Sequence, residues 1–351
     1  MTDGLGSNEK RKILTRREVK KAIKMQGPIR PPIVDGLTFP WQMRPAVHDV
    51  MERFPEDVIS TSITVSYWDA PDDDPDFRFA MRGMTRPGKI VRANFPVISD
   101  WGQLDEFLDQ FPGYLYQPYF DRVAQLRKEN PDAYIKVSLG HFLFWRMAEI
   151  RGLQNFLIDM YENPEELKIV IDRLLDMYAM WAKHLKEAGA DGLHGGDDIG
   201  TQRALFCRPE KFREIFNPAY ERLGDILHSN GLDFWLHSCG NITEIIDDLI
   251  GAGVDVLHPI QVGTMDAEAI ARKYGGKVCF HIGMDVQHLI PYETEDVIYR
   301  EVKNRMKMFY RPEGGAIFGA GNALTSDIPI KNIIAYSHAM EDFALEVAIN
   351  E

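Results

Sequence analysis

The stretch Leu232-Asp233-Phe234-Trp235-Leu236-His237-Ser238-Cys239-Gly240-Asn241 is the most informative part of the chain. An apolar run ends in a polar, glycine-containing segment, and a helical pattern begins directly after it at residue 242. This order predicts a buried strand, a tight turn and a helix. Alternate side chains of a strand share one face, so His237 and Cys239 are predicted to project together from the carboxyl end. One imidazole and one thiolate supply half of a tetrahedral zinc site; the alternative is a chance His-x-Cys pair with a buried cysteine, which is usually an inert small side chain.

The same alternation recurs along the chain. Strands are predicted at residues 58–65, 134–138, 192–194, 234–237, 254–258, 278–281 and 316–318. Helices are predicted between and after them, at residues 144–161, 164–188, 209–230, 242–252, 267–274, 293–308 and 330–348. Regular strand and helix alternation with short connections predicts a parallel sheet covered by helices. The fold class is therefore α/β, a TIM (β/α)8 barrel, whose eighth strand is expected within residues 77–98.

The sequence before residue 98 lacks the regular alternation of strands and helices, apart from the strand predicted at residues 58–65. Residues 1–12 are predicted to be a disordered tail, and residues 13–351 a single barrel domain. Within that domain, residues 13–56 form an N-terminal helical extension and residues 66–97 an irregular, acidic and proline-rich insertion.

Composition excludes several classes of protein. A net charge of -13 argues against a nucleic-acid surface, which needs clustered lysine and arginine. Every long apolar stretch is interrupted by charge, so no membrane span is expected, and the polar N-terminus offers no export signal. Three cysteines at unrelated spacings do not form a disulfide framework, which favours the cytoplasm.

Polar residues gather at the predicted carboxyl ends of the strands, where barrels of this type build their active sites. The candidates for catalysis are Asp198, Gln261 and Asp285, and the candidates for substrate binding are Tyr67, Trp68, His141, Phe142, His258, His281 and Asn322. Each histidine on a strand, His194 included, has the alternative of a core histidine bonded to backbone. Asp197 and Asp198 are adjacent; one is expected to face the cavity and the other to cap the following helix.

Taken together, these motifs resemble the uroporphyrinogen decarboxylase superfamily, which contains porphyrinogen decarboxylases and zinc-dependent, corrinoid-linked methyltransferases. The resemblance covers most of the chain from about residue 96 onward. It rests on the segments 140–143, 161–165, 196–198, 208–213, 217–218, 237–241, 283–287, 327–329 and 331–332. It implies a TIM barrel, and it is closer to the methyltransferase branch.

In that branch a His-x-Cys pair and a later cysteine hold zinc. His237 and Cys239 match the pair, but the last-strand loop reads Gly319-Ala320-Gly321-Asn322 and has no cysteine. Carboxylate oxygen is also a zinc ligand, so Asp198 is the expected third ligand, with Asp285 as the alternative. The decarboxylase branch fits less well, because an octacarboxylate substrate requires several arginines and the strand ends carry only Arg146.

The sequence therefore predicts a cytoplasmic enzyme that moves a methyl group between a small substrate and a corrinoid on a partner protein. An aromatic methyl ether is the favoured donor, and transfer to a thiol or a pterin is equally consistent with these ligands. One zinc ion per chain would act as a Lewis acid on the departing oxygen. The alternatives are a cofactor-free porphyrinogen decarboxylase and a non-catalytic barrel that binds a corrinoid or another ligand.

Overall fold

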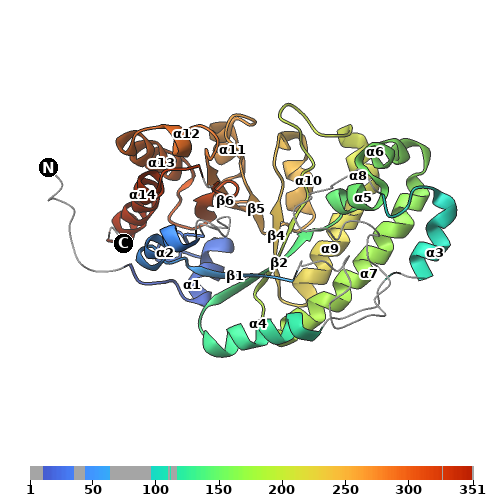
Figure 1. Cartoon of the computed structure of the whole chain (residues 1–351), viewed down its shortest axis with the longest axis horizontal. Helices are drawn as coiled ribbons and strands as arrows, with labels where there is room; N and C mark the ends of the chain where they lie inside the picture. The colour runs from blue at the N-terminus through green and yellow to red at the C-terminus, as the bar shows by residue number, and fades with distance from the viewer. Residues whose placement is uncertain are drawn as a thin grey trace. The chain divides into compact units, whose positions relative to one another are not determined.

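The computed structural model describes residues 11–34, 44–63, 96–109, 111, 117–325 and 327–349. These residues contain seven strands and many helices, and every strand pairing whose register is described is parallel. Together they form an α/β fold of the TIM-barrel type (Figure 1). The predicted insertion and the expected eighth strand fall mainly on residues 64–95, which lie outside the described part, as does the predicted N-terminal tail up to residue 10.

The chain divides into two compact units. One unit comprises residues 60–131 and 135–267, and the other comprises residues 1–59, 132–134 and 268–351. We refer to them as the central unit and the terminal unit, and each is described by itself.

The central unit contains consecutive parallel strands. β2 (Tyr134–His141) pairs with β3 (Gly192–Gly196), β3 with β4 (Asp233–His237), and β4 with β5 (Val256–His258). Most of β1 (Val58–Ser62) also belongs here, and the Ile63 amide beyond its end donates to the Ser138 carbonyl at 3.0 Å. All five of these strands were predicted within a few residues of their ends. The register sets Gly196 beside His237 and His237 beside His258.

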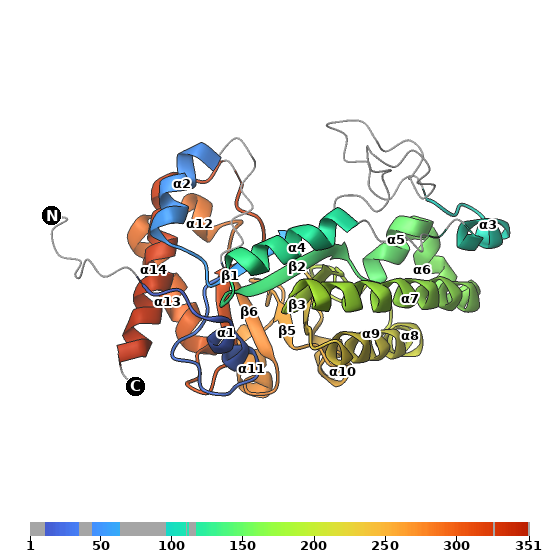
Figure 2. The ribbon, with the colours of Figure 1, turned by 90° about the horizontal axis from the view of Figure 1, so that it is seen from below.

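Helices cover this sheet. The longest is α7 (Pro164–Ala188), which has proline in its first turn as predicted and ends at Gly189 in the left-handed conformation. Figure 2 shows α7 running beside α4 (Gln117–Glu129) and α9 (Asn217–Ser229). Its buried face carries large apolar side chains such as Leu174, Tyr178 and Trp181.

Three predicted helices are each divided in two. Residues 144–161 form α5 (Phe144–Arg151) and α6 (Leu153–Glu162), separated by Gly152 with φ of 75°. Residues 209–230 form α8 (Pro209–Ile215) and α9, because Pro218 lacks the amide proton that a continuous helix needs. Residues 242–252 form a 3₁₀ turn, η3 (Thr243–Ile245), followed by α10 (Ile246–Gly251).

The terminal unit contains β6 (Cys279–Met284) and β7 (Ala316–Ala320), which pair in parallel. The helices on this pair are α11 (Ala267–Tyr274), α12 (Leu289–Tyr292), α13 (Glu295–Phe309) and α14 (Ile330–Ile349). The N-terminal extension contributes α1 (Arg16–Ile23) and α2 (Arg44–Arg53). Ile33 forms a parallel bridge with Phe318, so the segment after α1 extends the sheet beside β7.

Asp57 anchors the N-terminal extension inside the terminal unit. Its carboxylate accepts hydrogen bonds from the guanidinium groups of Arg11 and Arg30 at 2.7 Å each. The backbone amides of Leu14 and Ile33 donate to the same carboxylate at 2.8 Å. Burial alone would raise the pKa of Asp57, but these hydrogen bonds and charges together hold it below its usual range. None of the described helices is long and apolar enough to cross a membrane.

Candidate metal and substrate site

The carboxyl ends of β3, β4 and β5 are held side by side by backbone hydrogen bonds that continue beyond the strands. The amide of Asp197 donates to the carbonyl of His237 at 2.7 Å, and the amide of Ser238 donates to the carbonyl of His258 at 2.7 Å. This extended ladder brings the polar residues that follow the three strands into one neighbourhood. The prediction that these strand ends converge is therefore confirmed within the central unit.

His237, Cys239 and Asp198 form the first group of donors. The Sγ atom of Cys239 lies 3.2 Å from Nε2 of His237, and Oδ1 of Asp198 lies 3.5 Å from the same nitrogen. The amide of Cys239 donates to Asp198 Oδ1 at 2.9 Å, which fixes the carboxylate against the turn. In tetrahedral zinc the edges are about 3.4 Å between N or O ligands and about 3.6 Å between N and S. The observed separations are close to these values, so the three side chains fit a zinc ion.

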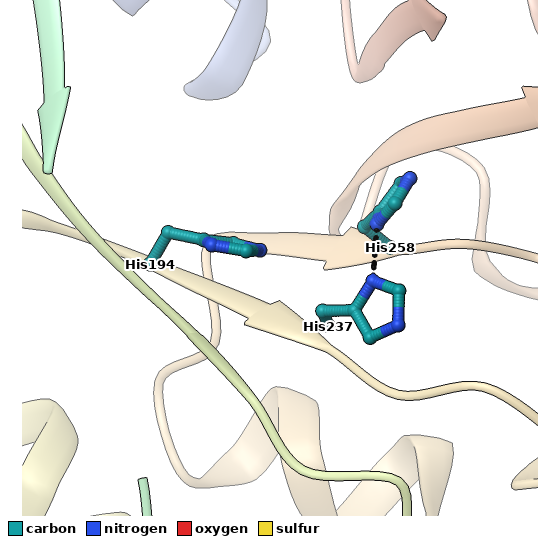
Figure 3. A group of neighbouring side chains, drawn as sticks. All are labelled: His194, His237 and His258. Carbon is teal, nitrogen blue, oxygen red and sulfur yellow. Dashed lines mark hydrogen bonds between the residues drawn. The ribbon is translucent and has the colours of Figure 1, made fainter. Parts of the chain in front are cut away.

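The second nitrogen of His237, Nδ1, faces a second group of donors, which His237 forms with His194 and His258. Nδ1 of His237 lies 2.7 Å from Nδ1 of His258 (Figure 3). One ligand atom each from His194, His237 and His258 lies within 4.8 Å of the others. Nδ1 of His194 lies 3.2 Å from the hydroxyl of Ser138.

Burial is the main reason that the pKa of His237 is lowered. Asp198 opposes this shift, whereas the charges of His141 and Lys136 add to it. The side chain of His237 is 19% exposed and that of Asp198 is 43% exposed. The imidazole is thus kept neutral, with a lone pair available to a metal, at a position that a small molecule can reach.

The two adjacent aspartates have different roles. Asp197 is fully buried and accepts hydrogen bonds from the amides of Leu143 and Trp145 at 2.7 and 2.8 Å and from the hydroxyl of Tyr220 at 2.6 Å. Burial raises the pKa of this carboxyl, and the hydrogen bonds and the charge of His141 oppose the shift without cancelling it. Asp197 thus stabilises the start of α5, not the helix after its own strand, and Asp198 is the carboxylate beside His237 and Cys239.

Two further predicted site residues flank this centre. Gln261 accepts the Gly240 amide through Oε1 at 2.6 Å and thereby holds the turn after Cys239. Nδ1 of His141 donates to the carboxylate of Glu149 at 2.9 Å, and Arg146 pairs with the other oxygen of Glu149. A Cβ atom built on Gly196 would lie 3.6 Å from the His141 ring and 3.8 Å from the His237 ring, so this glycine separates them.

Of the remaining predicted residues that the structure describes, one lies in the central unit and three lie in the terminal unit. Phe142 is fully buried in the central unit, with its ring 5.5 Å from that of Phe234. In the terminal unit, His281 is 5% exposed and its Nε2 contacts the carbonyl of Val34 at 3.0 Å, as a core histidine does. Asp285, the alternative third ligand, accepts the amides of the two residues at 287 and 288 at 2.9 Å, and Asn322 is exposed at the end of β7. Tyr67 and Trp68 lie outside the described residues.

Sequence reasoning left His194 out of the site and did not consider Glu149. Strand alternation contained the signal for His194, because His194 and Gly196 share one face of β3 and Gly196 pairs with His237. A glycine there leaves space that a neighbouring side chain on the same face can fill. No comparable pattern marks Glu149, which reaches His141 from α5.

The strand order, the helices and the position of the polar cluster at the carboxyl ends of the strands define a fold of the TIM-barrel type, with a group of donors that could hold a metal ion. The chain belongs to the uroporphyrinogen decarboxylase family, because the model of that family matches residues 143–343, more than half of the chain. A comparison with curated proteins gives no match.

Solved structures support the fold assignment. A methyltransferase from Methanosarcina mazei superimposes with a TM-score of 0.63 at 15% identity, covering 93% of this chain and 98% of the other. A B12-independent methionine synthase from Shewanella sp. W3-18-1 gives 0.45 at 13% identity, covering 66% and 67%. At these identities the first similarity shows the fold, and the second is too weak to support an inference.

Proposed function

We propose that this chain is a zinc-dependent methyltransferase that moves a methyl group between a small substrate and a corrinoid carried by a partner protein. The observation that carries the proposal is the convergence of Asp198, His237 and Cys239 at separations close to the edges of a zinc tetrahedron. The family membership and the fold shared with a methyltransferase agree with this assignment. An aromatic methyl ether is the donor class we favour, in a cytoplasmic enzyme.

The donor set suits zinc better than a hard cation. One thiolate, one imidazole and one carboxylate are all common zinc ligands, whereas magnesium and calcium prefer oxygen alone. Three protein ligands leave a fourth position open, as in catalytic zinc sites. When bound, zinc would supply a Lewis acid that stabilises the negative charge developing on a departing oxygen.

The neighbouring side chains of this chain position the ligands. The hydrogen bond between the two Nδ1 atoms allows His258 to accept the proton of His237, which leaves the Nε2 lone pair directed toward Cys239 and Asp198. Asp198 is fixed by the Cys239 amide, and the turn itself is fixed by Gln261. These contacts set the ligand geometry before any metal binds, which lowers the entropic cost of binding.

His141 is the residue we place nearest to the substrate's departing group. Its Nδ1 is held by Glu149, so its Nε2 is the nitrogen that can exchange a proton with a substrate. In ether demethylation the carbon–oxygen bond breaks, the methyl group passes to the reduced corrinoid, and the oxygen keeps the bonding electrons and gains a proton. His141 is suited to supply that proton.

Decarboxylation of a porphyrinogen is the second candidate, because the family carries that name. Such a substrate requires arginine side chains at the cavity. In the central unit, Arg146 follows β2, but it is 3% exposed and pairs with Glu149. This arginine is not available to a substrate carboxylate, so the site favours methyl transfer.

The deciding experiment is metal content with a methyl-transfer assay on the same preparations. The wild type is compared with Cys239→Ala and Asp198→Ala, and Cys207→Ala serves as the matched control. Cys207 lies in the same unit, and burial raises the pKa of its thiol to about 11, so it does not act as a thiolate ligand. We expect about one zinc per chain in the wild type and in the control, and its loss in the other two variants.

Turnover is measured by methylation of free cob(I)alamin with an aromatic methyl ether. Failure of the wild type to bind zinc from an excess of the metal would reject the proposal, and release of carbon dioxide from a porphyrinogen by the same preparation would establish the decarboxylase alternative. Binding of substrate without any turnover in the zinc-loaded protein would instead indicate a ligand-binding barrel.

A further inference from the structure

The ring of His237 lies between two different sets of metal donors. Nε2 faces Cys239 at 3.2 Å and Asp198 at 3.5 Å, whereas Nδ1 faces His258 at 2.7 Å. Figure 3 shows the ring of His194 pointing from β3 toward the other two histidines. A neutral imidazole has one lone pair and one N–H, so His237 can serve only one of these sets at a time.

The contact between Nδ1 of His237 and Nδ1 of His258 determines which nitrogen of His237 can bind a metal. Two nitrogens at 2.7 Å share one proton, so one of them donates and the other accepts. When His237 carries the proton on Nδ1, its Nε2 lone pair is available to the set with Cys239. When the proton is on Nε2, His237 donates toward Asp198 and its Nδ1 lone pair is available on the side of His258.

We propose that His194, His237 and His258 form a second metal site, which overlaps the first at His237 and takes a borderline divalent cation such as Zn²⁺, Co²⁺ or Ni²⁺. The two sites are mutually exclusive, and the tautomer of His237 selects between them. Three neutral imidazoles and no carboxylate are a donor set for borderline transition metals and not for magnesium or calcium. This inference goes beyond the proposed function: the two sites share His237 as a ligand, whereas Asp198 and His258 exchange the roles of ligand and hydrogen-bond partner.

The geometry requires small movements. The two Nδ1 atoms must separate from 2.7 Å to about 3.4 Å, the edge of a tetrahedron with metal–nitrogen bonds of about 2.05 Å. The donor atom of His194, now within 4.8 Å of the other two, must approach to a similar distance. Gly196, which pairs with His237 in the register, adds no side chain that would obstruct this approach.

The histidine rings already have hydrogen-bond partners on the nitrogens that would not bind the metal. The Ser138 hydroxyl contacts Nδ1 of His194 at 3.2 Å, so Nε2 of His194 is the nitrogen that would bind the metal. Asp198, 3.5 Å from Nε2 of His237, can accept the proton that this tautomer places there. Such partners on the nitrogen away from the metal orient ligating histidines in known metal sites.

Titration of the metal-free protein with Co²⁺, followed by absorption and calorimetry, tests the inference. A thiolate ligand gives an intense charge-transfer band in the near ultraviolet, whereas three imidazoles give only visible d–d bands. In the wild type we expect one Co²⁺ per chain with the thiolate band. In Cys239→Ser/Asp198→Asn we expect one Co²⁺ per chain without that band.

Adding His194→Phe or His258→Gln to the double variant is expected to weaken Co²⁺ binding by at least about 100-fold, since even outer partners contribute about 10 to 100-fold. The same two changes in the wild-type background are expected to preserve the thiolate band. Cys239→Ser alone provides the same test if the double variant does not fold, and circular dichroism verifies the fold of each variant.

The outcomes separate this inference from the proposed function. A double variant that folds and binds no Co²⁺ would refute the three-histidine site while leaving the first site intact. A wild type that holds two Co²⁺ ions at once would refute mutual exclusion. A wild type without a thiolate band, beside a double variant that binds Co²⁺, would reject the first ligand set and support the second.

Discussion

Two clusters of ionisable side chains in this protein differ in the groups that compose them and in their exposure to solvent. Around Asp57 in the terminal unit, one carboxylate accepts hydrogen bonds from the guanidinium groups of Arg11 and Arg30 and from two backbone amides. Around His237 in the central unit, the donors face one another at separations that leave room for an ion. The Asp57 cluster stabilises the fold, whereas the donors around His237 form a group that could hold a metal ion.

The two clusters also differ in how exposed their side chains are to solvent. The side chains of Asp57 and Arg11 are 0% and 2% exposed, whereas that of Asp198 is 43% exposed. A buried charge is retained in a fold only when its partners compensate for lost hydration, so the Asp57 cluster has no capacity for a ligand. The predictions below examine this contrast by removing members of each cluster.

Asp57→Ala is expected to have the largest effect on stability. It leaves two buried guanidinium groups without their partner, and breaking a buried pair in this way costs about 3–5 kcal/mol. The free energy of unfolding is measured with urea. Asp172→Ala is the control, because Asp172 forms an exposed pair with Arg222, and such pairs contribute about 0–1 kcal/mol. Equal losses in the two variants would contradict the contrast between the clusters.

Asp197→Ala and Asp198→Ala compare two adjacent carboxylates. Asp197→Ala removes the acceptor of three buried donors, so we expect a loss of roughly 3 kcal/mol in unfolding free energy. Asp198→Ala is expected to change stability by less than about 1 kcal/mol and to abolish zinc binding. Urea unfolding of the metal-free proteins, together with zinc content, measures both effects. The assignment of roles would be wrong if Asp197→Ala alone lost the metal.

The sequence predicted most of the fold because strand periodicity and helix signals are local. Every described strand of the sheet overlaps a predicted one, and the ends of α7 follow from Asn163-Pro164 and Gly189. The divided helices were missed because an apolar run on either side of Gly152 has the same helical period as a continuous helix. The positive φ of Gly152 ends α5, and α6 begins at the next residue.

The candidate site was predictable in part. Position at the carboxyl end of a strand predicted that His237, Cys239 and one of two adjacent aspartates are neighbours, and in the structure Asp198 is that aspartate. The sequence left the choice between Asp197 and Asp198 open, because the orientation depends on Tyr220 of α9 and on the start of α5, which are distant in sequence. The contact between His237 and His258 depends on the register of β4 and β5, which periodicity does not determine.

Gly195→Ala and Gly196→Ala compare the packed face of β3 with the face toward the site. A Cβ atom at residue 195 would lie 2.3 Å from the buried ring of Phe142, and such overpacking costs about 1–3 kcal/mol. At residue 196 the nearest atom is 3.2 Å away, so we expect a smaller loss of stability, with the added methyl group narrowing the space between His141 and His237. Unfolding by urea and the Michaelis constant for the substrate measure the two effects. Equal destabilisation by both changes would contradict this division of the strand.

The pH dependence of stability is expected to show the smallest effect, with opposite signs for the two buried aspartates. The pKa of Asp57 is lowered in the folded protein, so its stabilising contribution is present above the pKa of the unfolded chain, about 3.9, and is lost as pH falls through the folded value. The pKa of Asp197 is raised, because burial disfavours its charged form.

For Asp197 the folded state therefore binds the proton more tightly than the unfolded chain does. Stability contributed by this group rises as pH falls from its folded pKa toward about 3.9 and is constant below. Urea unfolding of Asp57→Asn and Asp197→Asn at a series of pH values measures each contribution as the difference from the wild type. That difference should shrink toward acid pH for Asp57→Asn and grow for Asp197→Asn. Parallel curves would mean that the pKa of Asp197, like that of Asp57, is lowered in the folded protein.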